Sequence, residues 1–318
     1  MQSVPTLSDI RAAANRIAKY AHRTPVLTSQ SLNQMVGALL FFKCENFQKV
    51  GAFKFRGACN AVFSLSDDEA AHGVATHSSG NHAAALALAA RLRGISATIV
   101  MPHTAPNIKK VAVASYGGRI IFSEPTLKAR EETLAAEVEK SGATVIHPYN
   151  DYRVIAGQGT AALELLEDVP NLDLMLAPVG GGGLISGTAL AVTSLSPHTK
   201  VIAVEPAGAD DAYRSIKAGR IIPSTNPKTI ADGLLTSLGD KTFPIIREKV
   251  AEIVTVAEDS IVQAMRYIWE RMKIIIEPSC AVPFAALLEG KLNVSGKRVG
   301  IILTGGNVDL DRLPWQRD

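Results

Sequence analysis

The sequence is poor in aromatic residues and cysteine, and neither sign of charge is in large excess. Aromatic residues make up 5% of the 318 residues, too few to suggest a base-stacking surface for nucleic acid. The formal net charge is only +3 and the basic residues are scattered, so we expect neither a nucleic-acid partner nor a membrane partner. Cys44, Cys59 and Cys280 are far apart, and no Cys-X-X-Cys pair occurs. Neither a disulfide framework nor a zinc site is therefore indicated.

Long apolar runs are also missing. No stretch of about 18 apolar residues is present, so no transmembrane helix is expected. The first residues lack the basic and apolar regions of a signal peptide, and the unpaired cysteines fit a reducing compartment. We therefore expect a cytoplasmic protein. Its length suggests two domains or one large α/β unit.

Short apolar runs alternate with helical patterns along most of the chain. Strands are expected at 73–77, 97–101, 119–122, 144–147, 172–179, 201–204 and 299–303. Helices are expected at 82–92, 107–116, 127–140, 160–166, 184–195 and 260–273. Repeated βα units predict an α/β fold with two doubly wound parallel-sheet domains and a ligand cleft between them. We assign residues 1–68 and 152–318 to a large domain and residues 69–151 to a small mobile domain.

Lys54 stands in an unusual local context. It lies between Phe53 and Phe55, in a segment bracketed by Gly51 and Gly57. An amine in apolar surroundings can have a depressed pKa and form a Schiff base. The alternative is an ordinary solvated lysine, which is what most lysines are.

Four consecutive glycines, Gly180, Gly181, Gly182 and Gly183, follow an apolar strand and open a helix. Such a run lets the backbone approach a ligand closely, and the helix N-terminus favours a phosphate. A flexible turn is the alternative, and the spacing does not match a P-loop. A ligand that needs both a reactive amine and a phosphate seat is pyridoxal phosphate (PLP).

Three other stretches follow expected strands. The loop Ser78-Ser79-Gly80-Asn81-His82 opens a helix and could bind a carboxylate, or it could be a plain capped turn. Thr304 precedes two glycines after the last strand, where its hydroxyl could reach a ring nitrogen, although a simple turn is the alternative. The loop from Glu205 to Asp211 carries carboxylates and backbone carbonyls that suit Mg²⁺ or Ca²⁺, unless it too is only a capped turn.

The order of these motifs resembles a known family. The series is Gly51-Ala52-Phe53-Lys54-Phe55-Arg56-Gly57-Ala58, Ser78-Ser79-Gly80-Asn81-His82, Ala156-Gly157-Gln158-Gly159-Thr160, the four glycines, and Thr304-Gly305-Gly306-Asn307. It is similar to the fold-type II PLP enzymes, which share a tryptophan synthase β-like fold. Within them it resembles the serine racemase and serine/threonine dehydratase branch, and the resemblance covers nearly the whole chain.

The resemblance implies a role for each motif. Lys54 would form the Schiff base, Phe53 would lie against the cofactor ring, and Asn81 would bond the ring hydroxyl. Gly180, Gly181, Gly182, Gly183 and the Leu184 N–H would hold the phosphate, and Thr304 would face the pyridine nitrogen. Ser78, Ser79, Asn81 and His82 would contact the substrate. Arg130 would pair with a β-carboxylate at the side-chain end of the substrate, or it would be an arginine on the surface of a helix. Glu205, Asp211 and the Ala209 carbonyl resemble a site for Mg²⁺, Mn²⁺ or Ca²⁺.

The activity implied by the resemblance is that of a PLP-dependent ammonia-lyase (dehydratase). Its substrate would be a small β-hydroxy amino acid: serine, threonine or 3-hydroxyaspartate. Ser79 would act as a second acid/base opposite Lys54, so racemisation of serine or aspartate is the alternative main activity. A non-catalytic PLP-holding or amino-acid-sensing protein is an alternative of another class, and the presence of both Lys54 and Ser79 argues against it. Relatives of this kind are commonly homodimers, and we expect the same here.

Overall fold

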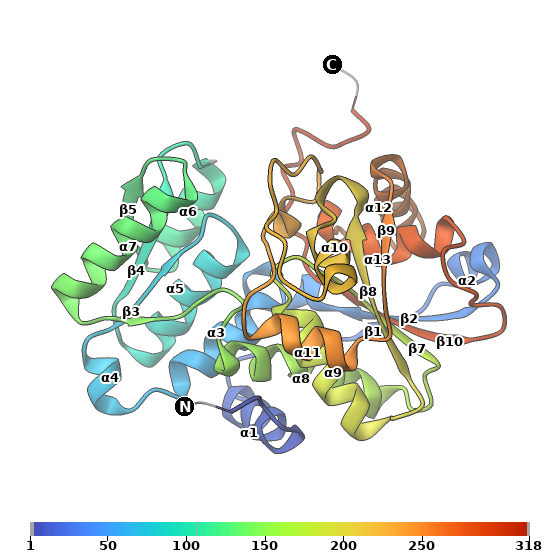
Figure 1. The fold of residues 1–318 in the computed structure, drawn as a ribbon, viewed down its shortest axis with the longest axis horizontal. Coiled ribbons are helices and arrows are strands. Elements are labelled where there is room, and N and C mark those ends of the chain that lie inside the picture. The colour runs from blue at the N-terminus through green and yellow to red at the C-terminus, as the bar shows by residue number, and fades with distance from the viewer. Residues whose placement is uncertain (1–2, 106, 317–318) are drawn as a thin grey trace.

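The computed structural model describes residues 3–105 and 107–316, in which the strands form two sheets (Figure 1). The larger sheet has the order β1 (Val26–Leu27), β2 (Leu39–Cys44), β10 (Arg298–Leu303), β7 (Leu174–Pro178), β8 (Lys200–Pro206) and β9 (Glu252–Val256). The smaller sheet has the order β5 (Arg119–Ser123), β4 (Ala97–Pro102), β3 (Val74–His77) and β6 (Thr144–Val145). All pairings are parallel except that of the edge strand β1 with β2. The predicted α/β fold with parallel sheets is confirmed.

Helices cover both faces of the larger sheet. One face packs on α2 (Gln30–Val36), α12 (Glu258–Met272) and α13 (Pro278–Leu288). The other packs on α1 (Leu7–Ile17), α8 (Tyr152–Asp168), α9 (Gly183–Leu195), α10 (Asp211–Ala218) and α11 (Thr242–Lys249). Successive strand residues point to opposite faces, so Leu174 and Leu176 enter one core and Met175 and Ala177 the other. A strand buried on both faces needs a continuous apolar run, which is what β7 has.

The smaller sheet is covered in the same way. Helices α5 (Asn81–Arg93) and α6 (Asn107–Ser115) pack on one face, where Val74 and Ile99 point. Helix α7 (Leu127–Ser141) packs on the other, against Ala75 and Val100. We call this sheet, its three helices and the short α4 (Asp67–Ala71) the smaller lobe, and the rest of the fold the larger lobe. The strands of the smaller sheet all lie within the segment 69–151, but the mobility of that segment stays a prediction.

Some elements were not predicted from the sequence. The strand β9 and the helices α11 and α13 had no expected counterpart, and α8 begins eight residues before its expected start. Helix α13 contains Pro278 at its first turn and Pro283 inside it. Proline at the first helical position is compatible with a helix, but a proline in the interior usually indicates a break.

Helix α3 (Lys54–Phe63) joins the two lobes. It packs against α8 of the larger lobe and against α5 of the smaller lobe. Its buried Phe55, Ala58 and Cys59 belong to the same apolar cluster as the core of the smaller lobe. The first residue of this helix is Lys54, so its amine lies where the lobes meet.

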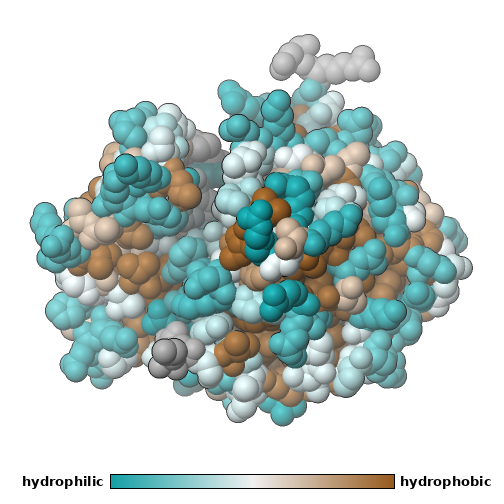
Figure 2. All heavy atoms as spheres, in the orientation of Figure 1, coloured by the Kyte–Doolittle hydropathy of each residue, from teal (hydrophilic) through white to brown (hydrophobic). Residues whose placement is uncertain are grey.

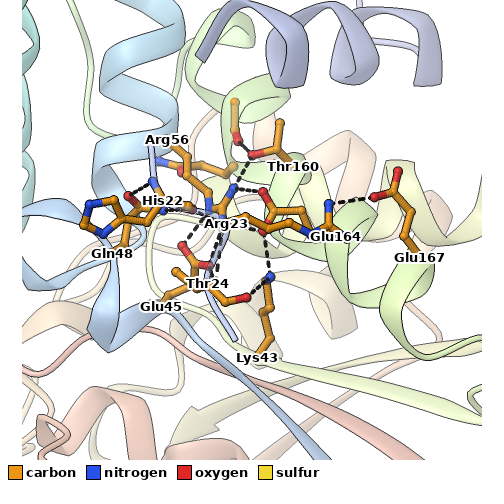
Figure 3. A network of polar contacts seen from close by, with 12 residues as sticks. His22, Arg23, Thr24, Lys43, Glu45, Gln48, Arg56, Thr160, Glu164 and Glu167 are labelled. Carbon is orange, nitrogen blue, oxygen red and sulfur yellow. Dashed lines mark hydrogen bonds and ion pairs between the residues drawn. The ribbon is translucent and has the colours of Figure 1, made fainter. Parts of the chain in front are cut away.

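A buried network of charges fixes the start of α3 (Figure 3). The Arg56 guanidinium contacts Glu45 through Nε (2.6 Å to Oε2) and Nη2 (2.8 Å to Oε1). It contacts Glu164 of α8 through Nη1 (2.7 Å to Oε1) and Nη2 (2.8 Å to Oε2). Lys43 adds a second cation, with Nζ 2.6 Å from Glu164 Oε2. Arg56 and Glu45 are fully buried, so each charge depends on the other for compensation.

Among the described residues, none of the helices combines the length and apolarity that a membrane span requires. Polar residues cover most of the face seen in Figure 2, and apolar side chains form separate patches on both lobes.

We predict that Arg56→Ala strongly destabilises the protein, because it leaves Glu45 buried without a cation. Removal of one partner from a buried pair costs about 3–5 kcal/mol. The matched control is Arg23→Ala, because Arg23 pairs with Glu167 and Asp168 at the surface. Such exposed pairs contribute about 1 kcal/mol or less. Urea unfolding of the two variants should show this difference, and equal losses of stability would contradict it.

Candidate active site

A cleft of about 540 Å³ lies between the lobes. It is at the carboxyl ends of the strands, since Ser78 follows β3, Gly180 follows shortly after β7 and Thr304 follows β10. All the residues predicted to bind cofactor or substrate line it: Phe53, Lys54, Ser78, Ser79, Asn81, His82, Arg130, Gly180, Gly181, Gly182, Gly183, Leu184 and Thr304. The structure therefore brings together residues that are up to 251 positions apart, from Phe53 to Thr304. The predicted metal ligands do not line this cleft.

Lys54 is held in the cleft by its neighbours along the chain. Phe53 N–H donates to Thr304 O over 3.0 Å, and Ala52 forms a β-bridge with Gly305, so the end of β10 anchors the residues before α3. Lys54 Nζ donates to Pro148 O over 2.9 Å and lies 5.1 Å from the centre of the Phe53 ring. Burial lowers the pKa of the Lys54 amine to about 8 despite the opposing charge of Glu277. More of the amine is then neutral near neutral pH than for an ordinary lysine, which favours nucleophilic attack.

The glycine run has no room for side chains. A Cβ at Gly181 would lie 2.3 Å from the Tyr149 ring, and a Cβ at Gly183 would lie 2.9 Å from Tyr149 Cβ. At Gly182 it would lie 2.7 Å from Ile246, and the φ of 91° there also favours glycine. The loop leads directly into α9, whose N-terminal N–H groups are free to bind an anion. A backbone cradle of this kind fits a phosphate.

Thr304 and Asn81 lie in the part of the cleft where a cofactor ring would fit. Thr304 is buried, and its hydroxyl has no hydrogen-bond partner among the described residues. A buried hydroxyl without a partner is costly, so this position fits a ligand atom such as a ring nitrogen. Asn81 begins α5 and faces the larger lobe, where its Nδ2 lies 3.0 Å from Glu277 Oε1.

The loop from Ser78 to His82 combines hydroxyls with a neutral histidine. Gly80 N–H donates to Ser78 Oγ over 3.3 Å, and Ser79 is half-buried beside it. His82 Nε2 lies 3.0 Å from Ile146 O, so this nitrogen carries the hydrogen. Burial lowers the pKa of His82 to about 3, so the ring is neutral at physiological pH. The loop therefore offers the hydroxyls of Ser78 and Ser79 and a neutral His82 ring to the cleft.

Arg130 of α7 lines the cleft rather than lying only at the surface. Its Nε has a long contact of 3.4 Å with Thr126 O, and it has no carboxylate partner among the residues the structure describes. A second cation, Lys109 of α6, also lines the cleft and pairs across it with Asp232 over 2.7 Å. Arg130, which lacks such a carboxylate among the described residues, suits a negatively charged group of a ligand.

Glu205, Ala209 and Asp211 lie together near the end of β8, outside the cleft. Glu205 accepts from the N–H groups of Ala212 (2.9 Å) and Tyr213 (3.0 Å). Both carboxylate oxygens of Asp211 are buried without a hydrogen-bond partner among the described residues. Burial raises the pKa of Glu205 to about 8 and that of Asp211 to about 6. Within the described chain no cluster of three or more His, Cys, Asp or Glu side chains could hold a metal, so a cation here would need backbone oxygens as well.

Several cleft residues were not identified from the sequence. They are Tyr149, Lys109, Asp232, Thr236 and Glu277. Asn307, the last residue of the Thr304-Gly305-Gly306-Asn307 motif, also lines the cleft. Glu277 is the residue before Pro278 at the start of α13, and a Glu-Pro pair before an apolar run is a signal for a helix start. Burial raises the pKa of the Glu277 carboxyl to about 7, with Asp232 adding to the effect.

Comparisons with known proteins show the family of the chain. The chain is 57% identical over 312 residues to a beta-hydroxyaspartate dehydratase of Paracoccus denitrificans (strain Pd 1222), covering 98% of this chain and 99% of that protein. It is 51% identical over 310 residues to an L-threo-3-hydroxyaspartate ammonia-lyase of Saccharomyces cerevisiae, covering 97% and 95%. The crystal structure of serine racemase from Dictyostelium discoideum superposes with a TM-score of 0.93 at 51% identity, covering 97% of this chain and 100% of that one. A family model described as "Pyridoxal-phosphate dependent enzyme" matches residues 17–305, and the chain belongs to this family.

Proposed function

We propose that the protein is a PLP-dependent ammonia-lyase whose main substrate is 3-hydroxyaspartate. The observation that supports this substrate is Arg130, a cation without a carboxylate partner among the described residues, on the wall of the cleft that holds Lys54. A β-carboxylate would complete that pair, whereas the side chains of serine and threonine would leave the cation unpaired. Two relatives at more than half identity carry hydroxyaspartate in their names.

The residues of the cleft fit the cofactor. When bound, PLP joins an amine through its aldehyde and withdraws electrons from the substrate Cα. The glycine cradle would hold its phosphate, Thr304 would meet its ring nitrogen, and Asn81 its ring oxygen. Because Thr304 is a neutral hydroxyl, it does not hold the ring nitrogen protonated as a carboxylate would. That weakens the electron sink and favours prompt loss of a leaving group.

Lys54 is the proposed base. Its amine takes the proton from the substrate Cα, and hydroxide then leaves from Cβ. The resulting enamine takes up water and yields a keto acid and ammonia. Arg130 and Lys109 would orient the β-carboxylate, and the N–H groups at the start of α5 would hold the α-carboxylate.

A coupled keto-acid assay over the L and D forms of 3-hydroxyaspartate, serine and threonine tests this proposal. We expect the highest kcat/KM for one isomer of 3-hydroxyaspartate, and no turnover by Lys54→Ala. Borohydride should attach the cofactor to the peptide that contains Lys54 in the native protein. The Arg130→Gln variant should lose hydroxyaspartate turnover by about tenfold or more, as expected for a lost charge pair, while serine turnover changes little. Preference for serine or threonine over every hydroxyaspartate isomer would refute the substrate assignment.

Racemisation of serine or aspartate is the second proposed activity, and the half-buried Ser79 hydroxyl in the cleft supports it. A group on the second face of Cα can return the proton with inverted configuration, while Lys54 serves the first face. The serine racemase similarity points the same way.

We predict that Ser79→Ala abolishes racemisation and the turnover of D substrates but leaves part of the L elimination. Ser78→Ala is the comparison variant, because Ser78 lies next in the chain and already accepts the Gly80 N–H, and it should not separate racemisation from L elimination. Chiral chromatography of the amino acid pool measures the first effect, and the keto-acid assay measures the second. Equal loss of both activities in Ser79→Ala would contradict the two-face assignment.

We also propose that Glu205, Asp211 and the Ala209 carbonyl bind Mg²⁺, Mn²⁺ or Ca²⁺. The two buried Asp211 oxygens without partners support this, because oxygen ligands of this kind suit hard divalent cations. A bound cation would compensate two buried carboxylates and so stabilise the end of β8 and the start of α10.

The expected outcome is that a chelator lowers both the melting temperature and the activity, and that any of the three cations restores them. Asp211→Asn should abolish this response. Asp210→Asn is the matched control, because Asp210 is adjacent but pairs with Arg214 instead. If the native protein melted at the same temperature with and without chelator, the proposed metal site would be refuted.

The three cysteines are free and buried, which supports a reducing, cytoplasmic location.

The homodimer stays a prediction from the sequence, and light scattering with and without substrate would test it. Movement of residues 69–151 as a unit also stays a prediction.

A further inference from the structure

The Asn81 side chain is bonded from two sides by residues of the larger lobe. Its Nδ2 lies 3.0 Å from Glu277 Oε1 and 3.1 Å from Oε2, and its Oδ1 accepts from Asn307 Nδ2 over 2.9 Å. Neither Glu277 nor Asn307 has a role in the function proposed above. Both line the cleft, and Glu277 is buried there.

The orientation of the amides follows from a backbone carbonyl. Asn307 Nδ2 donates to Val50 O over 2.7 Å, and a carbonyl can only accept. The nitrogen of Asn307 therefore faces Val50, and its second N–H is the one that meets Asn81 Oδ1. Asn81 must then turn its nitrogen towards Glu277, whose carboxylate is an acceptor.

This arrangement leaves one donor free. A side-chain amide nitrogen carries two N–H bonds, which point in different directions. The Nδ2 contacts of 3.0 and 3.1 Å are with the two oxygens of one carboxylate, which a single N–H can share, and no other acceptor for the second N–H occurs among the described residues. It is available to the ring oxygen of the cofactor, which is an acceptor when ionised. With the amide turned round, Oδ1 would face that oxygen, and two acceptors would repel each other.

The chain around Val50 shows that the arrangement is constrained. Val50 has a φ of 57°, which β-branched residues rarely adopt, and it lies four residues before Lys54. Asn307 bonds the carbonyl of this strained residue, so one side chain contacts both the segment that leads to Lys54 and the Asn81 amide.

We propose that Asn307 and Glu277 are positioning residues that lock the Asn81 amide with its nitrogen towards the cofactor ring oxygen. The proposal rests on the assignment of Asn81 to that oxygen. It adds the two residues that decide which atom of the amide is presented. Neither acts on a proton of the substrate.

The test compares isosteric variants by cofactor binding rather than by turnover. Asn307→Asp keeps the shape but removes both donated bonds and sets an acceptor against Asn81 Oδ1. Glu277→Gln keeps an acceptor oxygen for Asn81 Nδ2 and removes the charge. Asn307→Ala removes the bonds without adding charge. The control is Asn46→Asp, because Asn46 Nδ2 also donates to a backbone carbonyl, that of Ile275, over 3.1 Å.

Two measurements on each variant are needed: the dissociation constant of PLP, and the pH midpoint of the visible absorbance of the bound cofactor. We expect both Asn307 variants to weaken PLP binding by about tenfold, as the loss of about one net hydrogen bond would. We also expect them to shift the midpoint, because the ring oxygen loses its donor. Glu277→Gln leaves an acceptor for Asn81 Nδ2 and should weaken PLP binding less than the Asn307 variants do, whereas Asn46→Asp should stay within about threefold of the native protein, a change of less than one net hydrogen bond.

The outcomes separate this inference from the function itself. The inference would be overturned if both Asn307 variants kept the native PLP dissociation constant and the native pH midpoint. It would also be overturned if Glu277→Gln lost PLP binding while both Asn307 variants bound normally, because the charge of Glu277 and not the orientation of Asn81 would then control binding. Failure of the native protein to bind PLP through Lys54 would instead refute the proposed function. A melting curve for each variant shows that a loss of binding is not a loss of fold.

Discussion

The geometry of the active site depends on the buried Arg56 guanidinium. Its two carboxylate partners come from the turn after β2 and from α8, which are separated by more than a hundred residues of chain. A charge buried this deeply is costly when a partner is missing, so the network favours the arrangement in which the turn after β2 and α8 both reach the start of α3. Lys54 lies two residues before Arg56, and the carbonyl that holds its amine, that of Pro148, comes four residues before α8 begins. The same contacts that neutralise the arginine therefore place the amine.

The two lobes contribute different kinds of contact to the cleft. The larger lobe provides the amine, the glycine cradle and Thr304, which are the groups proposed for the cofactor. The smaller lobe provides the hydroxyl-bearing loop, Asn81 and the cations Lys109 and Arg130, which are proposed for the substrate or the edge of the ring. In the proposed function, binding of a cofactor and recognition of a substrate would thus draw on two hydrophobic cores. A complete site exists only where the lobes face each other.

Local patterns were sufficient to predict much of this arrangement. Apolar runs followed by glycine or serine predicted strands and the loops at their carboxyl ends. The segments identified around Lys54, Ser79, Gly181 and Thr304 all line the cleft. What could not be predicted are pairings between distant residues. Glu277 is 196 positions from Asn81, and Lys109 is 123 positions from Asp232. No periodicity or spacing carries such information, because these contacts depend on how the two sheets are placed. Helix α13 was missed for a local reason, since Pro283 inside it suggests a break while burial on all sides compensates for the lost hydrogen bond.

The surface between α3 and α5 is made largely of small side chains. Ala58, Cys59 and Ala61 of α3 belong to one buried cluster with Ala83, Ala87 and Ala90 of α5. Small residues produce low ridges and shallow grooves, which resist the sliding of one helix along another less than interlocked leucines do. The predicted movement of residues 69–151 would therefore meet little resistance at this contact. Bulkier residues at Ala58 or Ala87 would interlock α3 with α5 and oppose that movement without altering any side chain that lines the cleft.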